Sequence, residues 1–169
     1  ANMSDHEIRK LEGSASEFLN QPEVVAVFEA IEGAGGSARV VGGAVRNALL
    51  QEPIGDVDMA TDLPPGQTIK ALEAAGLKAV PTGIEQGTIT AVVDGKAVEV
   101  TSLRTDVQTD GRHAVVEFGT DWKEDAERRD FTVNAIYADA DGTLHDYVGG
   151  LTDVHSRTIR FIGDAVTRI

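Results

Sequence analysis

Two aspartates, Asp56 and Asp58, have the spacing that could bind a metal ion. On a β-strand, residues i and i+2 point to the same face, so a strand over 56–60 would place both carboxylates side by side. Their negative charges repel each other, and a hard divalent cation such as Mg²⁺ offsets that repulsion while it leaves positions open for substrate phosphates. An exposed strand end with two solvated aspartates is the alternative interpretation.

A glycine turn precedes the two aspartates in the chain. The segment Gly42–Arg46 reads Gly-Gly-Ala-Val-Arg and predicts a turn between a strand and a helix. Glycines let the backbone approach a phosphate closely, a helix N-terminus offers free N–H groups, and Arg46 would act as a charged phosphate ligand. A tight turn with a surface arginine is the alternative. Combined with the Asp-x-Asp pattern on the next strand, the turn indicates metal-dependent transfer from a nucleoside triphosphate.

Two further groups of charged residues fit the same chemistry. Glu99 lies in an otherwise apolar stretch, where a lone carboxylate is costly unless it is paired, hydrogen-bonded or bound to metal. An outward-facing position on an edge strand is the alternative. Arg128–Asp130 reads Arg-Arg-Asp and follows an acidic stretch over 124–127, which by itself predicts a charged helix face with local ion pairs.

The elements that must position these residues alternate between short strands and helices. We predict strands over 38–41, 56–60, 88–93, 97–103, 144–147 and 158–162. We predict helices over 4–20, 22–33, 44–50, 64–76 and 125–138, the last with a break near Asp130. The polar stretch 104–121 is predicted to be a long surface loop. This pattern predicts an α+β fold in which helices pack on a sheet.

Composition excludes several classes of protein. The 169 residues include 15 Lys+Arg, 28 Asp+Glu and no Cys, for a formal net charge of -13. The length predicts one domain that folds without disulfides or a structural metal, and the lack of Cys excludes thiolate zinc sites and cysteine nucleophiles. The acidic charge argues against a protein that holds nucleic acid through its overall electrostatic field.

The same sequence offers no segment for a membrane. Charged residues interrupt every apolar stretch well before the roughly 20 residues that a spanning helix needs. The N-terminus lacks an apolar signal region, so we expect a cytoplasmic protein. Ala1 and Asn2, which precede Met3, are interpreted as the remnant of a cleaved tag.

Five segments occur in an order that resembles a known family. They are Gly42–Arg46, Asp56–Thr61, Val98–Arg104, Arg128–Ala135 and Asp146–Gly150. In order and spacing they resemble the class II tRNA nucleotidyltransferases and bacterial poly(A) polymerases, from about position 38 to the last residue. That family belongs to the DNA polymerase β superfamily, so the resemblance implies a polymerase β-like nucleotidyltransferase palm, a mixed sheet flanked by helices.

The resemblance also implies roles for individual residues. The catalytic, metal-binding carboxylates would be Asp56, Asp58 and Glu99. The nucleotide-binding residues would be Gly42, Gly43, Arg46, Arg128, Arg129, Asp130 and Asn134. The implied reaction is Mg²⁺-dependent nucleotidyl transfer from CTP and ATP to the 3′ end of tRNA, which adds CCA and releases pyrophosphate. The stretch 104–121 resembles the family's mobile loop near the active site.

The chain departs from the family pattern at two places. Family members usually have Asp after the glycine motif, where this chain has Asn47, so a charge is exchanged for amide donors. The family also continues into a helical neck that selects the base, and residues 163–169 resemble only the approach to it. We therefore expect N-terminal helices over 1–36 and a head domain over 37–169 that is truncated before the neck. Such a head should bind tRNA poorly and turn over weakly.

Two alternative functions stay open. The head motifs do not distinguish CCA addition from a poly(A) polymerase that adds AMP to RNA 3′ ends. The second alternative is a non-catalytic module that binds a nucleotide or a partner on the same fold, which Asn47 and the missing neck would favour. Three convergent carboxylates count against it, because a binding module does not need them.

Overall fold

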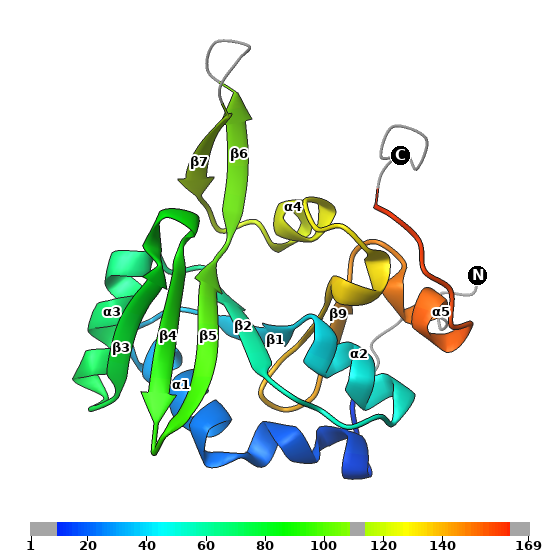
Figure 1. The fold of residues 1–169 in the computed structure, drawn as a ribbon, viewed down its shortest axis with the longest axis horizontal. Coiled ribbons are helices and arrows are strands. Elements are labelled where there is room, and N and C mark those ends of the chain that lie inside the picture. The colour runs from blue at the N-terminus through cyan, green and yellow to red at the C-terminus, as the bar shows by residue number, and fades with distance from the viewer. Residues whose placement is uncertain (1–9, 109–113, 163–169) are drawn as a thin grey trace.

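The framework of the protein is a seven-stranded mixed sheet (Figure 1). The computed structural model describes residues 10–108 and 114–162. The strands of the sheet are β1 (Ala38–Val41), β2 (Val57–Thr61), β3 (Lys78–Gly83), β4 (Thr88–Val93), β5 (Lys96–Ser102), β8 (Ile136–Ala138) and β9 (Leu144–Asp146). Their order is β3-β4-β5-β2-β1-β8-β9. Only β2 and β5 are parallel; every other neighbouring pair is antiparallel.

Two more strands form a separate antiparallel ribbon. They are β6 (Arg104–Gln108) and β7 (Ala114–Phe118), and in Figure 1 they project away from the main sheet above β5. The ribbon is anchored at its base, because the Gly119 N–H donates to the Leu103 carbonyl at 2.9 Å and the Thr105 hydroxyl donates to Glu124 Oε1 at 2.7 Å.

Helices surround the sheet. The α-helices are α1 (Pro22–Gly33), α2 (Gly43–Leu50), α3 (Pro65–Ala74), α4 (Trp122–Glu127) and α5 (Gly150–His155), and the 3-10 segments are η2 (Gly13–Asn20), η3 (Ile84–Gln86) and η4 (Thr132–Asn134). Both α1 and α3 have proline in the first turn, where the missing N–H costs nothing and the fixed φ suits a helix. The α+β prediction, with helices flanking a mixed sheet, is confirmed.

The two faces of the sheet differ in how they are covered. On one face, η2, α1, α2 and α3 bury a large apolar core in which Val40, Met59 and Val100 are at most 1% exposed. The opposite face carries a smaller cluster that includes Val41, Ala60 and Tyr137 and packs against α4. Because side chains alternate along a strand, Asp58 and Glu99 lie on this less covered face.

Three predicted elements are wrong. The stretch 104–121 is a loop only in part, because it forms the β6-β7 ribbon. The predicted helix 125–138 ends at Glu127, and Ile136–Ala138 is instead a buried strand between β1 and β9. No strand forms over 158–162, where Phe161 makes only an isolated bridge to Phe131. Neither β3 nor α5 was predicted.

The N-terminal helix prediction is only partly met. Within 4–20, the described residues form the 3-10 segment η2 rather than an α-helix. The interpretations of Ala1, Asn2 and residues 163–169 fall outside the described residues. Across the described ranges, no helix is both long enough and apolar enough to cross a bilayer.

Candidate active site

Four neighbouring strands place one row of residues across the sheet. In the register of the strands, Glu99 on β5 pairs with Asp58 on β2, Asp58 pairs with Val41 on β1, and Val41 pairs with Tyr137 on β8. Asp56 directly precedes β2. The row therefore joins the two predicted carboxylates of the strands to the end of β1, after which the glycine turn begins.

Asp58 and Glu99 of the row, and Asp56 just before β2, repel one another. Burial raises the pKa of Asp58 above its ordinary value, and the negative charges of Glu99 and Asp56 raise it further, while the Arg129 charge acts in the opposite direction. Asp56, Asp58 and Glu99 each keep an exposed surface, although the atoms packed around the Asp58 carboxylate remove part of its hydration. Among the residues that the structure describes, no three His, Cys, Asp or Glu side chains converge as a complete metal cluster. The three carboxylates are still the donor type that a hard divalent cation takes.

The glycine turn leads directly from this row into α2. Gly42 adopts φ 88° and ψ -142°, a conformation that essentially only glycine tolerates. The turn ends β1 beside Asp58 and starts α2 at Gly43, so the free N–H groups of the helix begin next to the carboxylates. A Cβ added at Gly43 would lie 3.2 Å from an Arg46 guanidinium nitrogen, so glycine also leaves room for that side chain.

The guanidinium of Arg46 is held by two amides. Its Nε donates to Asn47 Oδ1 at 3.1 Å, and its Nη1 donates to Asn134 Oδ1 at 2.9 Å. Asn134 lies in η4, far from Arg46 in the sequence, so the structure brings together two residues that were predicted to bind nucleotide. The other end of the Asn47 amide donates to the Pro53 carbonyl at 3.0 Å.

The other two predicted arginines share one buried carboxylate. Asp125 is 1% exposed; its Oδ1 accepts from Arg128 at 2.9 Å, and its Oδ2 accepts from Arg129 at 3.2 Å and from the Tyr137 hydroxyl at 2.7 Å. Burial alone would raise the pKa of Asp125, but the Arg129 charge and the hydrogen bonds from Tyr137 and Arg128 outweigh it and hold the pKa below its ordinary value.

Asp125 and Tyr137 are site residues that the sequence prediction missed. The i+3 and i+4 spacing of Arg128 and Arg129 from Asp125 gave a signal for local ion pairs, and both pairs form. Nothing local indicated Tyr137, whose hydroxyl also accepts from Arg129 Nε at 3.3 Å and whose ring lies 5.6 Å from the Arg129 guanidinium. Because Arg129 also acts on Asp58, it connects this buried group to the exposed carboxylates.

The segment 146–150 positions η4, which carries Asn134, through a series of hydrogen bonds. One oxygen of Asp146 accepts from the N–H groups of Gly149 and Gly150 at 2.9 Å, and the other accepts from Leu151 at 2.9 Å, which fixes the start of α5. From α5, Asp153 accepts a hydrogen bond from the Thr132 hydroxyl. Thr132 opens η4, so this chain of contacts fixes the segment that presents Asn134 to Arg46.

Asp130 is the one predicted residue that stands apart. It is exposed, and its carboxylate accepts from the neighbouring Phe131 N–H at 2.7 Å. Its carbonyl accepts from the Ile162 N–H at 2.9 Å. These contacts give Asp130 a local structural role next to the arginines.

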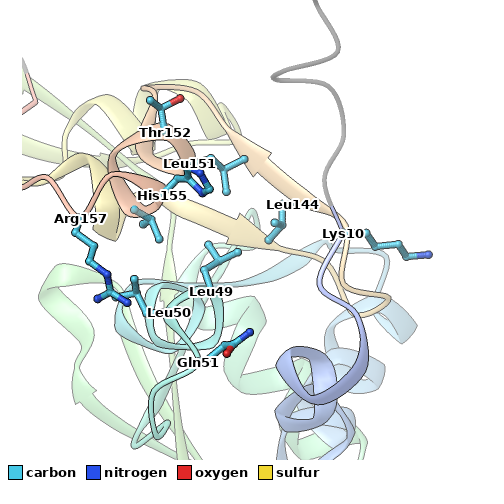
Figure 2. A pocket seen from close by; sticks show the side chains of 10 residues that line it. Lys10, Leu49, Leu50, Gln51, Leu144, Leu151, Thr152, His155 and Arg157 are labelled. Carbon is cyan, nitrogen blue, oxygen red and sulfur yellow. The ribbon is translucent and has the colours of Figure 1, made fainter.

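Among the described residues, cavities also lie outside the row, and two of them are well formed. The larger, of about 720 Å³, lies between the end of α2, β9 and α5 (Figure 2). Leu49, Leu50, Leu144 and Leu151 line it, with His155 and Arg157 beside them, and none of the predicted site residues does. A smaller one of about 250 Å³ lies at the start of β2, where Asp56, Glu23 and Lys96 line it.

Comparisons with known proteins identify the family and the fold. A family model for the poly A polymerase head domain matches residues 38–160. CCA tRNA nucleotidyltransferase 1, mitochondrial, of Danio rerio is 48% identical over 132 residues, which cover 78% of this chain and 31% of the relative. The CCA-adding enzyme of Streptococcus gordonii is 41% identical over 161 residues, which cover 94% of this chain and 39% of the relative.

A solved structure gives the same result for the fold. The Bacillus stearothermophilus CCA-adding enzyme in complex with CTP matches with a TM-score of 0.77 and 36% identity, over 93% of this chain and 36% of that chain. The sheet and its helices thus define the class, an α+β nucleotidyltransferase head fold. Within that class, the chain belongs to the poly A polymerase head domain family. It spans between 31% and 39% of the length of these relatives.

Proposed function

We propose that this chain is the catalytic head of a tRNA nucleotidyltransferase that uses CTP and ATP to add CCA to the 3′ end of tRNA. The observation that carries the proposal is the row Glu99-Asp58-Val41 with the glycine turn at its end, because it sets carboxylates beside a phosphate-binding helix start. The relatives named CCA-adding enzyme support the choice of substrate. Of the predicted nucleotide-binding arginines, Arg46 follows the glycine turn and bonds Asn134, and Arg129 acts electrostatically on Asp58.

The division of work among the residues follows from their positions. The first N–H groups of α2 and the Arg46 guanidinium bind phosphate oxygens of the nucleotide. Arg129, which Asp125 and Tyr137 hold in place, supplies a second positive charge near Asp58. Because phosphoryl transfer asks for little covalent chemistry from the protein, orientation and charge compensation by these groups provide most of the rate.

Asp56, Asp58 and Glu99 are the residues that would hold Mg²⁺. Their oxygen donors fit the ion. Burial and then the charges of Glu99 and Asp56 raise the pKa of Asp58, and a cation would offset the repulsion between these charges. Bound there, Mg²⁺ would supply Lewis-acid chemistry, lowering the pKa of an acceptor hydroxyl and offsetting negative charge on the leaving pyrophosphate.

Calorimetric titration tests the proposal. This chain is titrated with ATP and with CTP, with and without Mg²⁺, beside an Asp56→Ala/Asp58→Ala variant whose fold is checked by circular dichroism. We expect Mg²⁺-dependent binding of both nucleotides with little preference, and its loss in the variant. No binding, or binding that is indifferent to Mg²⁺ and to both aspartates, would favour a non-catalytic module on this fold.

Polyadenylation is the second candidate, because the chain belongs to the poly A polymerase head domain family. Incubation of the protein with ATP, CTP and a tRNA that lacks its 3′ CCA distinguishes the two. A short, defined addition that contains both C and A supports the tRNA nucleotidyltransferase. A long tail of A alone supports the poly(A) polymerase.

A further inference from the structure

The side chain of Asn47 is placed between two groups with opposite hydrogen-bonding needs. Arg46 Nε can only donate and the Pro53 carbonyl can only accept, and they lie 3.1 Å and 3.0 Å from the two ends of the Asn47 amide. This fixes which end is oxygen and which is nitrogen. An amide satisfies both neighbours at once, whereas a carboxylate could satisfy only the arginine.

The contacts of Asn47 reach the segment that carries Asp56. Besides the side-chain bond to Pro53, the Asn47 carbonyl accepts from the Glu52 N–H at 2.8 Å. Both bonds fix the short connection from α2 to β2, which ends at Asp56. Asn47 therefore positions both the Arg46 guanidinium and the connection between α2 and β2 that ends at Asp56.

The partners of Arg46 leave its charge uncompensated. Asn47 and Asn134 are neutral, and among the described residues no carboxylate oxygen lies within the 4.0 Å of an ion pair with Arg46. Arg128 and Arg129, in contrast, share the Asp125 carboxylate. Arg46 is thus held by two neutral amides and has no carboxylate partner among the described residues.

We propose that Asn47 is a positioning residue that presents Arg46 as an uncompensated cation to the phosphates of the nucleotide and sets the segment leading to Asp56. The proposal rests on the proposed function and deepens it. It attributes the preference of the phosphate site for highly charged nucleotides to the neutral amide of Asn47, which leaves the Arg46 charge uncompensated. Affinity should consequently rise with the number of phosphate charges, from AMP to ATP.

Substitution of Asn47 by Asp and by Ala separates positioning from charge. Asn47→Asp keeps an acceptor for Arg46, loses the donor to Pro53 and adds a negative charge beside the guanidinium. Asn47→Ala loses both bonds and adds no charge. Asn20→Asp is the matched control, since it makes the same change of net charge at an exposed residue of η2.

Calorimetry with ATP and AMP at low and moderate salt gives the readout. We expect Asn47→Asp to weaken ATP binding roughly tenfold, AMP binding much less, and the difference to shrink as salt screens the added charge. Asn47→Ala should weaken ATP and AMP by a similar small factor, and Asn20→Asp should leave both unchanged. Wild-type ATP affinity in Asn47→Asp, or an equal loss for ATP and AMP, would overturn the proposal.

An NMR measurement without nucleotide distinguishes a failure of the proposed function from a failure of the positioning role of Asn47. The ¹⁵N signal of the Arg46 Nε–H, assigned by its disappearance in Arg46→Lys, should be protected from exchange in the wild type and in Asn47→Asp but not in Asn47→Ala. If the wild type binds no nucleotide while this pattern holds, the proposed function fails and the positioning by Asn47 stands. If the signal is unprotected in the wild type, the positioning fails whatever the nucleotide does.

Discussion

Asp58 and Asp125 are two carboxylates in opposite electrostatic surroundings. Asp58 lies exposed beside Glu99 and Asp56, and its pKa is raised. Asp125 is buried and accepts hydrogen bonds from Arg128, Arg129 and Tyr137. Burial raises its pKa, but the Arg129 charge and these hydrogen bonds outweigh burial and lower it. The difference separates two surroundings of an acidic residue: Asp58 is left among like charges, which the proposed function assigns to Mg²⁺, and Asp125 uses its charge to hold the arginines.

The largest effect should come from Asp125→Asn. The variant leaves two partly buried guanidinium groups without their counter-charge, and removal of one partner of a buried ion pair costs about 3 kcal/mol or more. Urea denaturation followed by circular dichroism measures the loss. Asp94→Asn, at an exposed hairpin position, is the control and should change stability little. A change within about 0.5 kcal/mol for Asp125→Asn would contradict the comparison.

A smaller effect should come from Tyr137→Phe. The variant keeps the ring, which packs edge-on against Trp122 at 5.4 Å between centroids, and removes only the hydroxyl that bonds Asp125 and Arg129. The expected cost is about 1 kcal/mol. Measured again in Asp125→Asn, the cost should be clearly different, because the two groups are in contact. Simple additivity would show that the hydroxyl does not act through Asp125.

The smallest effect, and one of opposite sign, should come from Asp58→Asn. Since the folded pKa of Asp58 lies above its ordinary 3.8, ionisation opposes folding, and this penalty is complete only above the folded pKa. The variant should therefore melt about 1–2 °C higher than the wild type at pH 7 and no higher below about pH 3.8. Thermal melts across this range, monitored by circular dichroism, make the measurement.

Asp125 should show the reverse pH dependence in the same melts. Its folded pKa lies below 3.8, so its contribution is present above 3.8 and is lost as the pH falls through the folded pKa. The cost of Asp125→Asn should then be largest at neutral pH and shrink in acid. If both variants changed stability in the same direction at pH 7, the two carboxylates would not differ as described.

Sequence patterns predicted the elements whose signals are local. Proline at the start and glycine at the end marked α1, and the apolar strands around Asp94-Gly95 gave the hairpin β4-β5. The i, i+2 spacing predicted Asp56 and Asp58 on a strand over 56–60, and β2 forms one residue later, so that Asp56 directly precedes it. The glycine turn into α2 formed where it was predicted. In each case, the residues that decide the conformation are neighbours in the chain.

The errors arose where distant partners decide. Ile136–Ala138 is a strand because β1 and β9 pair with it, although its apolar residues also fit a helix. The ribbon β6-β7 has no partner in the main sheet and thus lacks the pattern of a buried strand. The bond from Asn134 to Arg46 and the hydroxyl of Tyr137 on Asp125 depend on side chains that only the folded sheet brings together.

The single parallel strand pair has a kinetic consequence. The hairpins β3-β4 and β4-β5 close between neighbours in sequence, whereas β2 must wait for β5 across the intervening helix and hairpins. Such long-range pairing carries a larger loop-closure entropy and slows folding. Because Asp58 and Glu99 come into register only through that pairing, we expect the acidic site to form after the local hairpins.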